Sequence, residues 1–415
     1  MTPQEKWQDY LQMLKKPFHK RCRLRFLNPD GTTAFSVDNN EKNRLSSAFI
    51  SDGTLTVNLQ NGARRTVSGI TFDGNFEQFQ YNVNNLWFGT EIALDEGLVL
   101  SDGSDYYIQQ GVFLVESPTE IISPDSRLIQ YDLIDKWAYL DGTLGGNLEC
   151  THEVPVGTNI FQPISALLVE DRGNGLPIDR VTPVYTEYYN GMTQVLPDGS
   201  TAYLTDTPYT LRIDGDSGTI GAVIDGLAAM LNAWYGYDPT GALRFDPSQD
   251  DILDSTKPIL YDFSMDDVTL LGLTYTSNPA EVYNDYIVVG EQLDNYAQPK
   301  GRAQNFAPES PTNINLIGRK TVRETKSGYG TDTMCQDYAV WMLKRSAVLQ
   351  QSITISCSQM FHLVENALVS VKRTDKKGSP VERHLVHGFS RPISHEGAMT
   401  INAVSVHDFP SATIS

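Results

Sequence analysis

Three runs between residues 85 and 142 decide the fold class of this chain: NLWFGT at 85–90, YYIQQGVFLV at 106–115 and DLIDKWAYLDG at 132–142. Each run is short, rich in aromatic and β-branched residues, and closed by Gly, Pro or Asp. This pattern is typical of strands between tight turns. The runs contain no nucleophile, no metal-ligand spacing and no phosphate-binding loop, so they indicate architecture rather than chemistry.

The composition is that of a folded, acidic chain. Its 415 residues suggest two or three domains, and 40% apolar against 20% charged residues argue against disorder. Acidic residues outnumber basic residues 51 to 32, which gives a formal net charge of −19. This charge opposes nonspecific nucleic-acid binding, because Lys and Arg are needed to neutralise phosphates. Two interpretations stay open: solubility alone, or an acidic channel lining that repels passing DNA.

The sequence carries no signal for a membrane or for export. No segment approaches the ~18 consecutive apolar residues of a membrane span, and the N-terminus lacks an apolar signal core. The four cysteines form no Cys-x-x-Cys pair; they are Cys22, Cys150, Cys335 and Cys357. We therefore expect reduced, mostly buried thiols and folding in a cytoplasm.

The N-terminus predicts an amphipathic helix at 3–16. Thr2 and Glu5 form a capping box, and Pro3 suits the first helical position. The apolar face consists of Trp7, Tyr10, Leu11 and Leu14. A helix this short has to dock that face on its own barrel or on a neighbouring subunit.

From Arg21 the apolar period changes to two. Leu24 and Phe26 alternate with arginines, and a second alternating segment leads to Asn61-Gly62, a strong hairpin turn. Six or more short strands within 120 residues indicate a barrel or a sandwich.

The middle of the chain differs in kind. Apolar residues recur every three or four positions and predict a helix at about 219–235, stopped by Gly236 and Pro239. A strand at 243–245 follows. We interpret residues 151–255 as a small α+β domain inserted between two barrel regions, 1–150 and 256–415.

The last third returns to β structure. We expect a buried strand at 286–290, a helix at 332–349 and an alternating strand at 352–357. A basic hairpin tip follows at 372–377, which we interpret as a solvated turn or a contact with an acidic tail protein.

Several of these segments resemble phage tail hub proteins, which close the distal end of a tail tube. The resemblance rests on the three runs, on NGARR at 61–65 and on PESPTNINLIGR at 308–319, a run that in hub-like proteins precedes a helix and the second barrel. It implies a mainly β fold with an α+β insert. It also implies two barrels per subunit, so that a trimer presents a pseudo-hexameric ring.

The same resemblance implies a function and partners. The trimer would adapt the six-fold tube to a three-fold tip at the end of the virion tail. Its partners would be a distal tail protein or tube hexamer, a tape measure protein and a separate tip or receptor-binding protein, while genomic DNA passes through. The chain ends at Ser415 without the stalk, lysin or receptor-binding extension of longer members. If the channel for DNA is lined by acidic and polar side chains, Arg64, Arg65 and the basic tip should lie away from the lumen, at contacts with neighbours.

One tetrad, Gly215-Asp216-Ser217-Gly218, matches the surroundings of the nucleophile in trypsin-like proteases. A triad also needs a His base, and neither His19 nor His152 upstream has the matching Ala-His-Cys context. We interpret Ser217 as the cap of the following helix. A calcium loop at 214–225 fails on its spacing.

The remaining polar candidates are weak. His384 and His387 would lie on opposite faces of a strand, which disfavours a shared metal. The pairs Asp250-Asp251 and Asp266-Asp267 do not define two carboxylates facing across a cleft. We therefore predict a non-enzymatic protein with no catalytic, metal-binding or cofactor-binding residues.

Two other functions are alternatives on the sequence alone. The first is a carbohydrate-binding adhesin, whose stacking platforms would be Tyr106, Tyr107, Trp137, Tyr188, Tyr189 and Trp234. We assign most of these aromatic residues to cores and expect Trp137 to be largely buried. The second is a cell-wall hydrolase.

Overall fold

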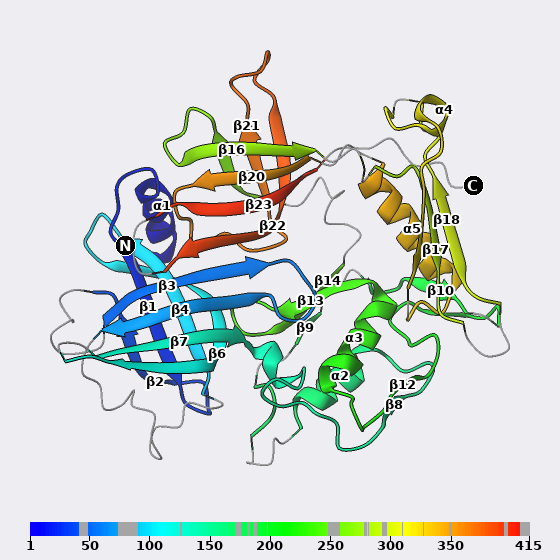
Figure 1. The fold of residues 1–415 in the computed structure, drawn as a ribbon, viewed down its shortest axis with the longest axis horizontal. Coiled ribbons are helices and arrows are strands. Elements are labelled where there is room, and N and C mark those ends of the chain that lie inside the picture. The colour runs from blue at the N-terminus through cyan, green and yellow to red at the C-terminus, as the bar shows by residue number, and fades with distance from the viewer. Residues whose placement is uncertain are drawn as a thin grey trace.

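Figure 1 presents a computed structural model of the chain. The structure describes all residues other than 41–48, 74–89, 125–126, 171–175, 181–182, 186–188, 197, 248–257, 278–279, 281, 293–296, 309, 327, 348–350, 394–396 and 407–415. Residues 85–89 of the NLWFGT run therefore lie outside the described part. So do Tyr188, Asp250, Asp251 and His395.

Seven strands of the N-terminal region form a ring. They are β1 (Lys20–Leu27), β2 (Thr33–Asp38), β3 (Phe49–Asn58), β4 (Arg65–Asp73), β5 (Ile92–Val99), β6 (Asp105–Ile122) and β7 (Arg127–Asp135). Hydrogen bonds connect them in the order β3-β2-β1-β5-β6-β7-β4, and β4 pairs with β3 to complete the ring. The link between β2 and β3 is a single parallel pair, Asp38 opposite Phe49. The expected mainly β fold is confirmed.

Six C-terminal strands extend the same sheet. They are β15 (Ile259–Ser264), β16 (Leu270–Ser277), β20 (Gln351–Cys357), β21 (Leu368–Lys372), β22 (Val381–Pro392) and β23 (Met399–Val406). Among the described residues their pairings form an open series, β15-β21-β22-β23-β20-β16. Strand β22 also pairs with β3, where Phe389 lies opposite Val57. One hydrophobic cluster consequently runs through both strand systems.

Burial follows the alternation that the sequence predicts. Leu24 and Phe26 on β1 are fully buried, and so are Ile355 and Cys357 on β20. Their neighbours along each strand are partly exposed, because successive side chains point to opposite faces. All four cysteines are free thiols, and only Cys150 is exposed.

Helix α1 (Pro3–Met13) docks on its own chain. Its capping box is present as predicted, since the Thr2 hydroxyl accepts from the backbone N–H of Glu5 while the Glu5 carboxylate accepts from that of Thr2. Tyr10 is fully buried, and its hydroxyl accepts a 3.0 Å bond from the backbone N–H of Phe361. The helix thus joins the N-terminus to a loop more than 340 residues later in the chain.

The middle of the chain combines helices with short strands. These elements are η3 (Lys136–Tyr139), β8 (His152–Val154), α2 (Phe161–Leu168), β9 (Val184–Tyr185), β10 (Thr193–Val195), β11 (Thr201–Tyr203), β12 (Leu211–Ile213), α3 (Ile220–Leu231), β13 (Ala233–Tyr237) and β14 (Leu243–Pro247). Trp137 lies in η3 and is only 5% exposed, as expected.

The predicted extent of the central helix is wrong at its C-terminal end. Helix α3 ends at Leu231, and Asn232 adopts a left-handed conformation with φ of 49°. Trp234 belongs to β13, where it lies opposite Asp246 of β14. Asparagine tolerates this conformation better than most residues and can therefore terminate a helix. Gly236 and Pro239 follow at positions that are already outside the helix.

The predicted cap of this helix is also wrong. Thr219, not Ser217, is the N-cap residue, and its hydroxyl accepts a 3.0 Å bond from the backbone N–H of Ala222. Ser217 is exposed in the preceding turn.

Substitutions at these two positions should separate the two caps. Thr219→Ala should lower the free energy of unfolding by about 0.5–2 kcal/mol, because it leaves an N–H at the helix start without its acceptor. Ser217→Ala should change it by less than about 0.5 kcal/mol, as is usual for exposed sites. Urea denaturation of both variants measures the difference. An equal loss in the two variants would contradict the assignment of Thr219.

A three-stranded sheet and two helices lie beside the middle region. They consist of β17 (Asp285–Val289), β18 (Lys300–Gln304), α4 (Ile314–Ile317), β19 (Thr321–Thr325) and α5 (Asp332–Ser346). The strand expected at 286–290 and the helix expected at 332–349 are thereby confirmed within one to three residues. A second hydrophobic cluster combines buried residues of β17, β18 and α5 with buried residues of α2, α3 and β13. The boundaries 1–150, 151–255 and 256–415 stay a prediction.

Candidate functional site: a buried charged junction

The most unusual polar feature of the fold is a buried carboxylate, Glu96, between the ring and the C-terminal strands. It lies on β5, a strand almost wholly buried on both faces. The guanidinium of Arg391 on β22 donates to Glu96 Oε2 from Nε at 2.9 Å and from Nη2 at 2.7 Å. Both side chains are fully buried. The two residues are 295 positions apart, so only the fold brings them together.

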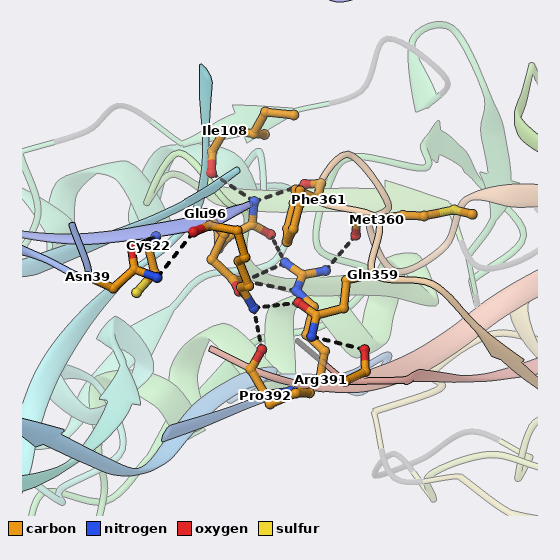
Figure 2. A network of polar contacts seen from close by, with 12 residues as sticks. Cys22, Asn39, Glu96, Ile108, Gln359, Met360, Phe361, Arg391 and Pro392 are labelled. Atoms are coloured by element: carbon orange, nitrogen blue, oxygen red, sulfur yellow. Dashed lines mark hydrogen bonds and ion pairs between the residues drawn. The ribbon is translucent and has the colours of Figure 1, made fainter. Parts of the chain in front are cut away.

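A second cation completes this junction. Lys20 Nζ on β1 lies 2.8 Å from Glu96 Oε1 and donates to Gln359 Oε1 and to the carbonyl of Pro392. Figure 2 shows Gln359 and Pro392 beside Glu96 and Arg391. Strands β1 and β5 of the ring are thereby connected to β22 and to the loop that contains Gln359.

The remaining donors of Arg391 are also satisfied. Its Nη1 donates to the carbonyl of Met360 at 2.8 Å, and its Nη2 donates to the side chain of Gln110 on β6. Gln110 Nε2 in turn donates to the carbonyl of Phe361 at 2.9 Å. A buried charge is tolerated only when it is paired and hydrogen-bonded. The two cations beside Glu96 and the hydrogen bonds of Arg391 meet most of this requirement.

The electrostatics of the junction favour a charged Glu96. Burial by itself raises the pKa of a carboxyl, but Arg391 and Lys20 outweigh it and hold the pKa of Glu96 below its usual value. Burial also lowers the pKa of Lys20, against the opposing attraction of Glu96. The junction therefore contains a carboxylate held between two cations, an arrangement suited to fixing a geometry rather than to transferring a proton.

A second junction links the ring to the middle region and corrects an expectation. Arg64 and Arg65, predicted to lie at contacts with neighbouring subunits, are buried within the chain. Arg65 Nη2 donates to Glu365 Oε2 at 2.5 Å and its Nη1 donates to the carbonyl of Tyr237. Arg64 Nη1 lies 3.5 Å from Glu365 Oε1. These arginines are therefore internal cross-links and not surface contacts.

A third junction, again a buried ion pair, lies close by. Lys136 Nζ donates to Asp179 Oδ1 at 2.5 Å and to the carbonyl of Gly241 at 3.1 Å. It also lies 4.9 Å from the ring centroid of Tyr237. The three junctions together hold the strand systems and the middle region by directional bonds in addition to apolar packing.

Among the described residues, Ser217 of the protease-like tetrad has no histidine base hydrogen-bonded to it. His152 lies on β8 opposite Ile213, in the same small sheet that precedes Ser217, while His19 is exposed and far away in sequence. The hydrogen bonds of the described residues include none between His152 and Ser217. Neither do these residues include a group of three or more His, Cys, Asp or Glu side chains able to hold a metal ion.

The other sequence candidates have structural roles. His384 is fully buried on β22, with Nδ1 3.2 Å from the hydroxyl of Ser405, whereas His387 is only half-buried and lies at an irregularity between β22 and β23. Asp267 accepts from the backbone N–H of Thr269 at 3.1 Å, as a turn residue does. None of the described helices has the length and apolar character that crossing a membrane requires.

The aromatic candidates for a sugar platform are mostly covered. Trp137 and Tyr189 are buried, and Tyr106 and Trp234 are half-buried. The guanidinium of Arg23 lies 4.3 Å from the centroid of the Tyr107 ring. Their assignment to cores is thus confirmed for the two buried residues.

The basic hairpin tip is largely paired within itself. Arg373 Nη2 donates to Asp375 at 2.6 Å, and Lys376 Nζ donates to Glu382 at 2.7 Å. Strands β21 and β22 form the hairpin, as predicted. This pairing favours the solvated turn.

Together, the closed ring, the extended sheet and the buried junctions define a cross-linked β scaffold. Its fold is similar to that of several solved phage tail proteins. The 43 kDa tail protein of prophage MuSo2 from Shewanella oneidensis has 11% sequence identity and a TM-score of 0.55, covering 93% of this chain and 98% of that chain. The tail protein from Neisseria meningitidis MC58 has 10% identity and a TM-score of 0.56, covering 94% and 97%.

A third tail protein agrees with these two. Prophage tail protein gp18 from Listeria monocytogenes EGD-e has 8% identity and a TM-score of 0.51, covering 93% of this chain and 94% of that chain. No protein-family model and no curated protein matches the sequence. The resemblance to phage tail proteins that the sequence indicated is therefore confirmed at the level of the fold.

Proposed function

We propose that this chain is a structural virion protein of a phage tail tip or baseplate, in which three copies form a hub at the distal end of the tail tube. The observation that carries this proposal is the match to three tail proteins over at least 93% of this chain and of each of them. A match over both whole lengths argues for a shared architecture rather than for one small module in unrelated proteins.

The proposed trimer adapts a six-fold tube to a three-fold tip. Each subunit would offer two β units, the ring of β1–β7 and the C-terminal strands, so that three subunits offer six. Its neighbours would be a distal tail protein or tube hexamer, a tape measure protein and a separate tip or receptor-binding protein. The role needs no catalysis and no cofactor.

The buried junctions support this role physically. The six β units of a trimer can make equivalent contacts with a six-fold ring only when the two units of each subunit keep one fixed relative orientation. The contacts among Lys20, Glu96 and Arg391 join these two units by directional bonds, and apolar packing alone would restrict that orientation less. A pairing between β3 and β22 fixes the same boundary.

The net charge of −19 supports a further element of the proposal, an acidic channel. DNA carries one phosphate charge per ~1.7 Å of duplex axis, so a basic wall would hold the genome and an acidic wall would let it pass. Inward-facing side chains should then be richer in Asp, Glu, Ser, Thr, Asn and Gln than in Lys and Arg.

The experiment that tests the proposal is a mass measurement followed by imaging. Purified protein, alone and mixed with the tail tube or distal tail protein of the same phage, should give a particle of three subunits of 46.2 kDa. Electron microscopy should show three-fold symmetry around an axial opening. A monomer under all conditions, or a particle with a solid centre or a mainly basic pore, would contradict the proposal.

A further inference from the structure

The three-stranded sheet β18-β17-β19 has one face packed and one face turned outward. Val288 and Ala303 belong to the second hydrophobic cluster together with Cys335 and Ala339 of α5. At Gly301 a Cβ atom would lie 2.3 Å from the backbone of Cys335. Since successive side chains of a strand point to opposite faces, the neighbours of these residues point away from α5.

The outward face carries cations. Register places Arg302 on β18, Ile287 on β17 and Arg323 on β19 in one row across the sheet. Lys300 lies on the same face of β18, because it is two residues from Arg302. Lys300 and Arg323 are exposed and Ile287 is half-buried.

A buried carboxylate anchors part of this face. Asp285 is fully buried and accepts two 2.9 Å bonds from the guanidinium of Arg302, while Arg319 lies 3.7 Å from it. We call Lys300, Arg302, Arg319 and Arg323 the basic face. With Asp285 at its centre and Asp332 at its edge, beside Lys300, the face keeps an excess of positive charge in a chain of charge −19.

Next to the basic face lies an apolar tip that is held in a fixed shape. Asn284 Nδ2 donates to the carbonyls of Thr312 and Gly318 at 3.0 and 2.8 Å, and Asn313 Nδ2 donates to the carbonyl of Ala307 at 2.8 Å. Asn284, Thr312 and Asn313 are buried. The polar residues of the PTNINLIGR segment thus build a rigid loop.

This loop leaves two of its three large apolar side chains in solvent. Leu316 is 67% exposed and Ile317 is 46% exposed, and α4, which carries them, lies at one end of the β17–β18 sheet (Figure 1). Because bonds from two buried side chains, Asn284 and Asn313, already order the loop, binding a partner costs little further conformational entropy. The cores of protein interfaces are more apolar than the rest of the surface, and arginine is enriched in interfaces, so exposed apolar side chains beside arginines suit a protein partner.

We propose that the basic face and the α4 tip form the surface by which one copy of this chain binds an acidic surface of a second copy. The proposal rests on the proposed function and names the contact that closes the ring. The basis is charge complementarity: an excess of 19 negative charges supplies carboxylates for a partner face, while the basic face supplies the cations. A contact between two unlike patches repeats around an axis and can close a trimer.

A nucleic acid is the less suitable occupant. The Arg302 guanidinium is already held by Asp285, and Leu316 and Ile317 have no partner in a phosphate backbone. The exposed aliphatic side chains favour a protein partner.

The test is a charge reversal on the basic face that leaves Asp285, Arg302 and Arg319 unchanged. The double variant Lys300→Glu/Arg323→Glu should dissociate at protein concentrations where the parent is trimeric, with the subunit dissociation constant raised at least about tenfold. Mass photometry and analytical ultracentrifugation measure the oligomeric state and the dissociation constant. The parent trimer should also dissociate more readily as the salt concentration rises from about 0.05 to about 0.5 M, because salt screens the attraction between exposed opposite charges.

The matched control changes the same charge elsewhere. Lys372→Glu/Lys377→Glu, on the basic hairpin tip, should leave the trimer intact. Circular dichroism melting of all variants distinguishes lost assembly from lost folding, and Leu316→Ser/Ile317→Ser gives a second, uncharged disruption of the same surface.

The outcomes separate the two proposals. A monomeric parent would contradict the proposed hub as well as this interface. A trimeric parent whose Lys300→Glu/Arg323→Glu variant stays trimeric would contradict the interface alone. If that variant stays trimeric but no longer binds the tail tube protein or duplex DNA, the occupant is that partner and the assignment to a second copy is wrong.

Discussion

Glu96→Gln is expected to lower the free energy of unfolding by about 3–5 kcal/mol, the usual effect of removing one partner from a buried ion pair. The substitution keeps the shape of the side chain and removes its charge. Arg391 and Lys20 would then remain buried without the carboxylate that compensates them. Urea denaturation followed by circular dichroism gives the difference directly.

An exposed ion pair on the same ring provides the control. Asp105 accepts a 2.9 Å bond from Arg21 near the surface, so Asp105→Asn should cost no more than about 1 kcal/mol. If Glu96→Gln is as mild as Asp105→Asn, the junction does not hold the two strand systems together.

The pH dependence of the free energy of unfolding, compared between the parent and Glu96→Gln, tests independently whether Glu96 is charged in the folded state. The folded-state pKa of Glu96 is lowered from its usual value of 4.5. A depressed carboxyl pKa contributes stability that is fully present above the unfolded value and is lost as pH falls through the folded value. The difference between the parent and Glu96→Gln should therefore be largest near neutral pH and should shrink below about pH 4.5. A difference that grows on acidification would contradict a charged Glu96.

Trp137→Ala is expected to cost about 3–5 kcal/mol and to reduce soluble yield, as truncation of a buried Trp usually does. The ring is wedged among three elements. A Cβ at Gly62, in the β3–β4 turn, would lie 2.9 Å from Trp137 Nε1, and one at Gly221 of α3 would lie 3.3 Å from the ring. Its centroid is 5.5 Å from that of Tyr235 on β13. Removing the ring leaves a cavity where these three elements meet. The surrounding structure can relax into this cavity only partly.

Trp234→Ala is the matched control for this substitution. Trp234 lies next to Tyr235 on β13 but is half-exposed, so its truncation removes less buried area and should cost clearly less. A Trp137→Ala variant that melts within about a degree or two of the parent, or that melts above Trp234→Ala, would show that the ring is not essential to this contact.

The elements that the sequence predicted well depend on residues within a few positions of each other. The Thr2–Glu5 capping box forms as expected, and the alternation at Leu24 and Phe26 matches their burial. Such patterns report directly on side-chain periodicity and on local hydrogen bonds, which do not require a partner from another part of the chain.

The errors arose where tertiary structure competes with a local signal. The apolar period of α3 continues to Trp234, but pairing with β14 takes residues Ala233–Tyr237 into a strand. Ser217 and Thr219 are both acceptable caps in sequence, and the position at which the chain enters the helix selects Thr219.

The sequence by itself determined the mainly β class and the buried face of the strands with clear alternation, such as those of Leu24 and Phe26 and of Ile355 and Cys357. A period of two residues specifies which side chains share a face. Only the tertiary structure decided which charges are buried. Arg65 and Glu365 are 300 positions apart, and Arg391 and Glu96 are 295 apart. An arginine in a strand is equally compatible with solvent and with a buried carboxylate. The choice depends on whether the fold brings a partner close enough to offset the cost of removing both charges from water.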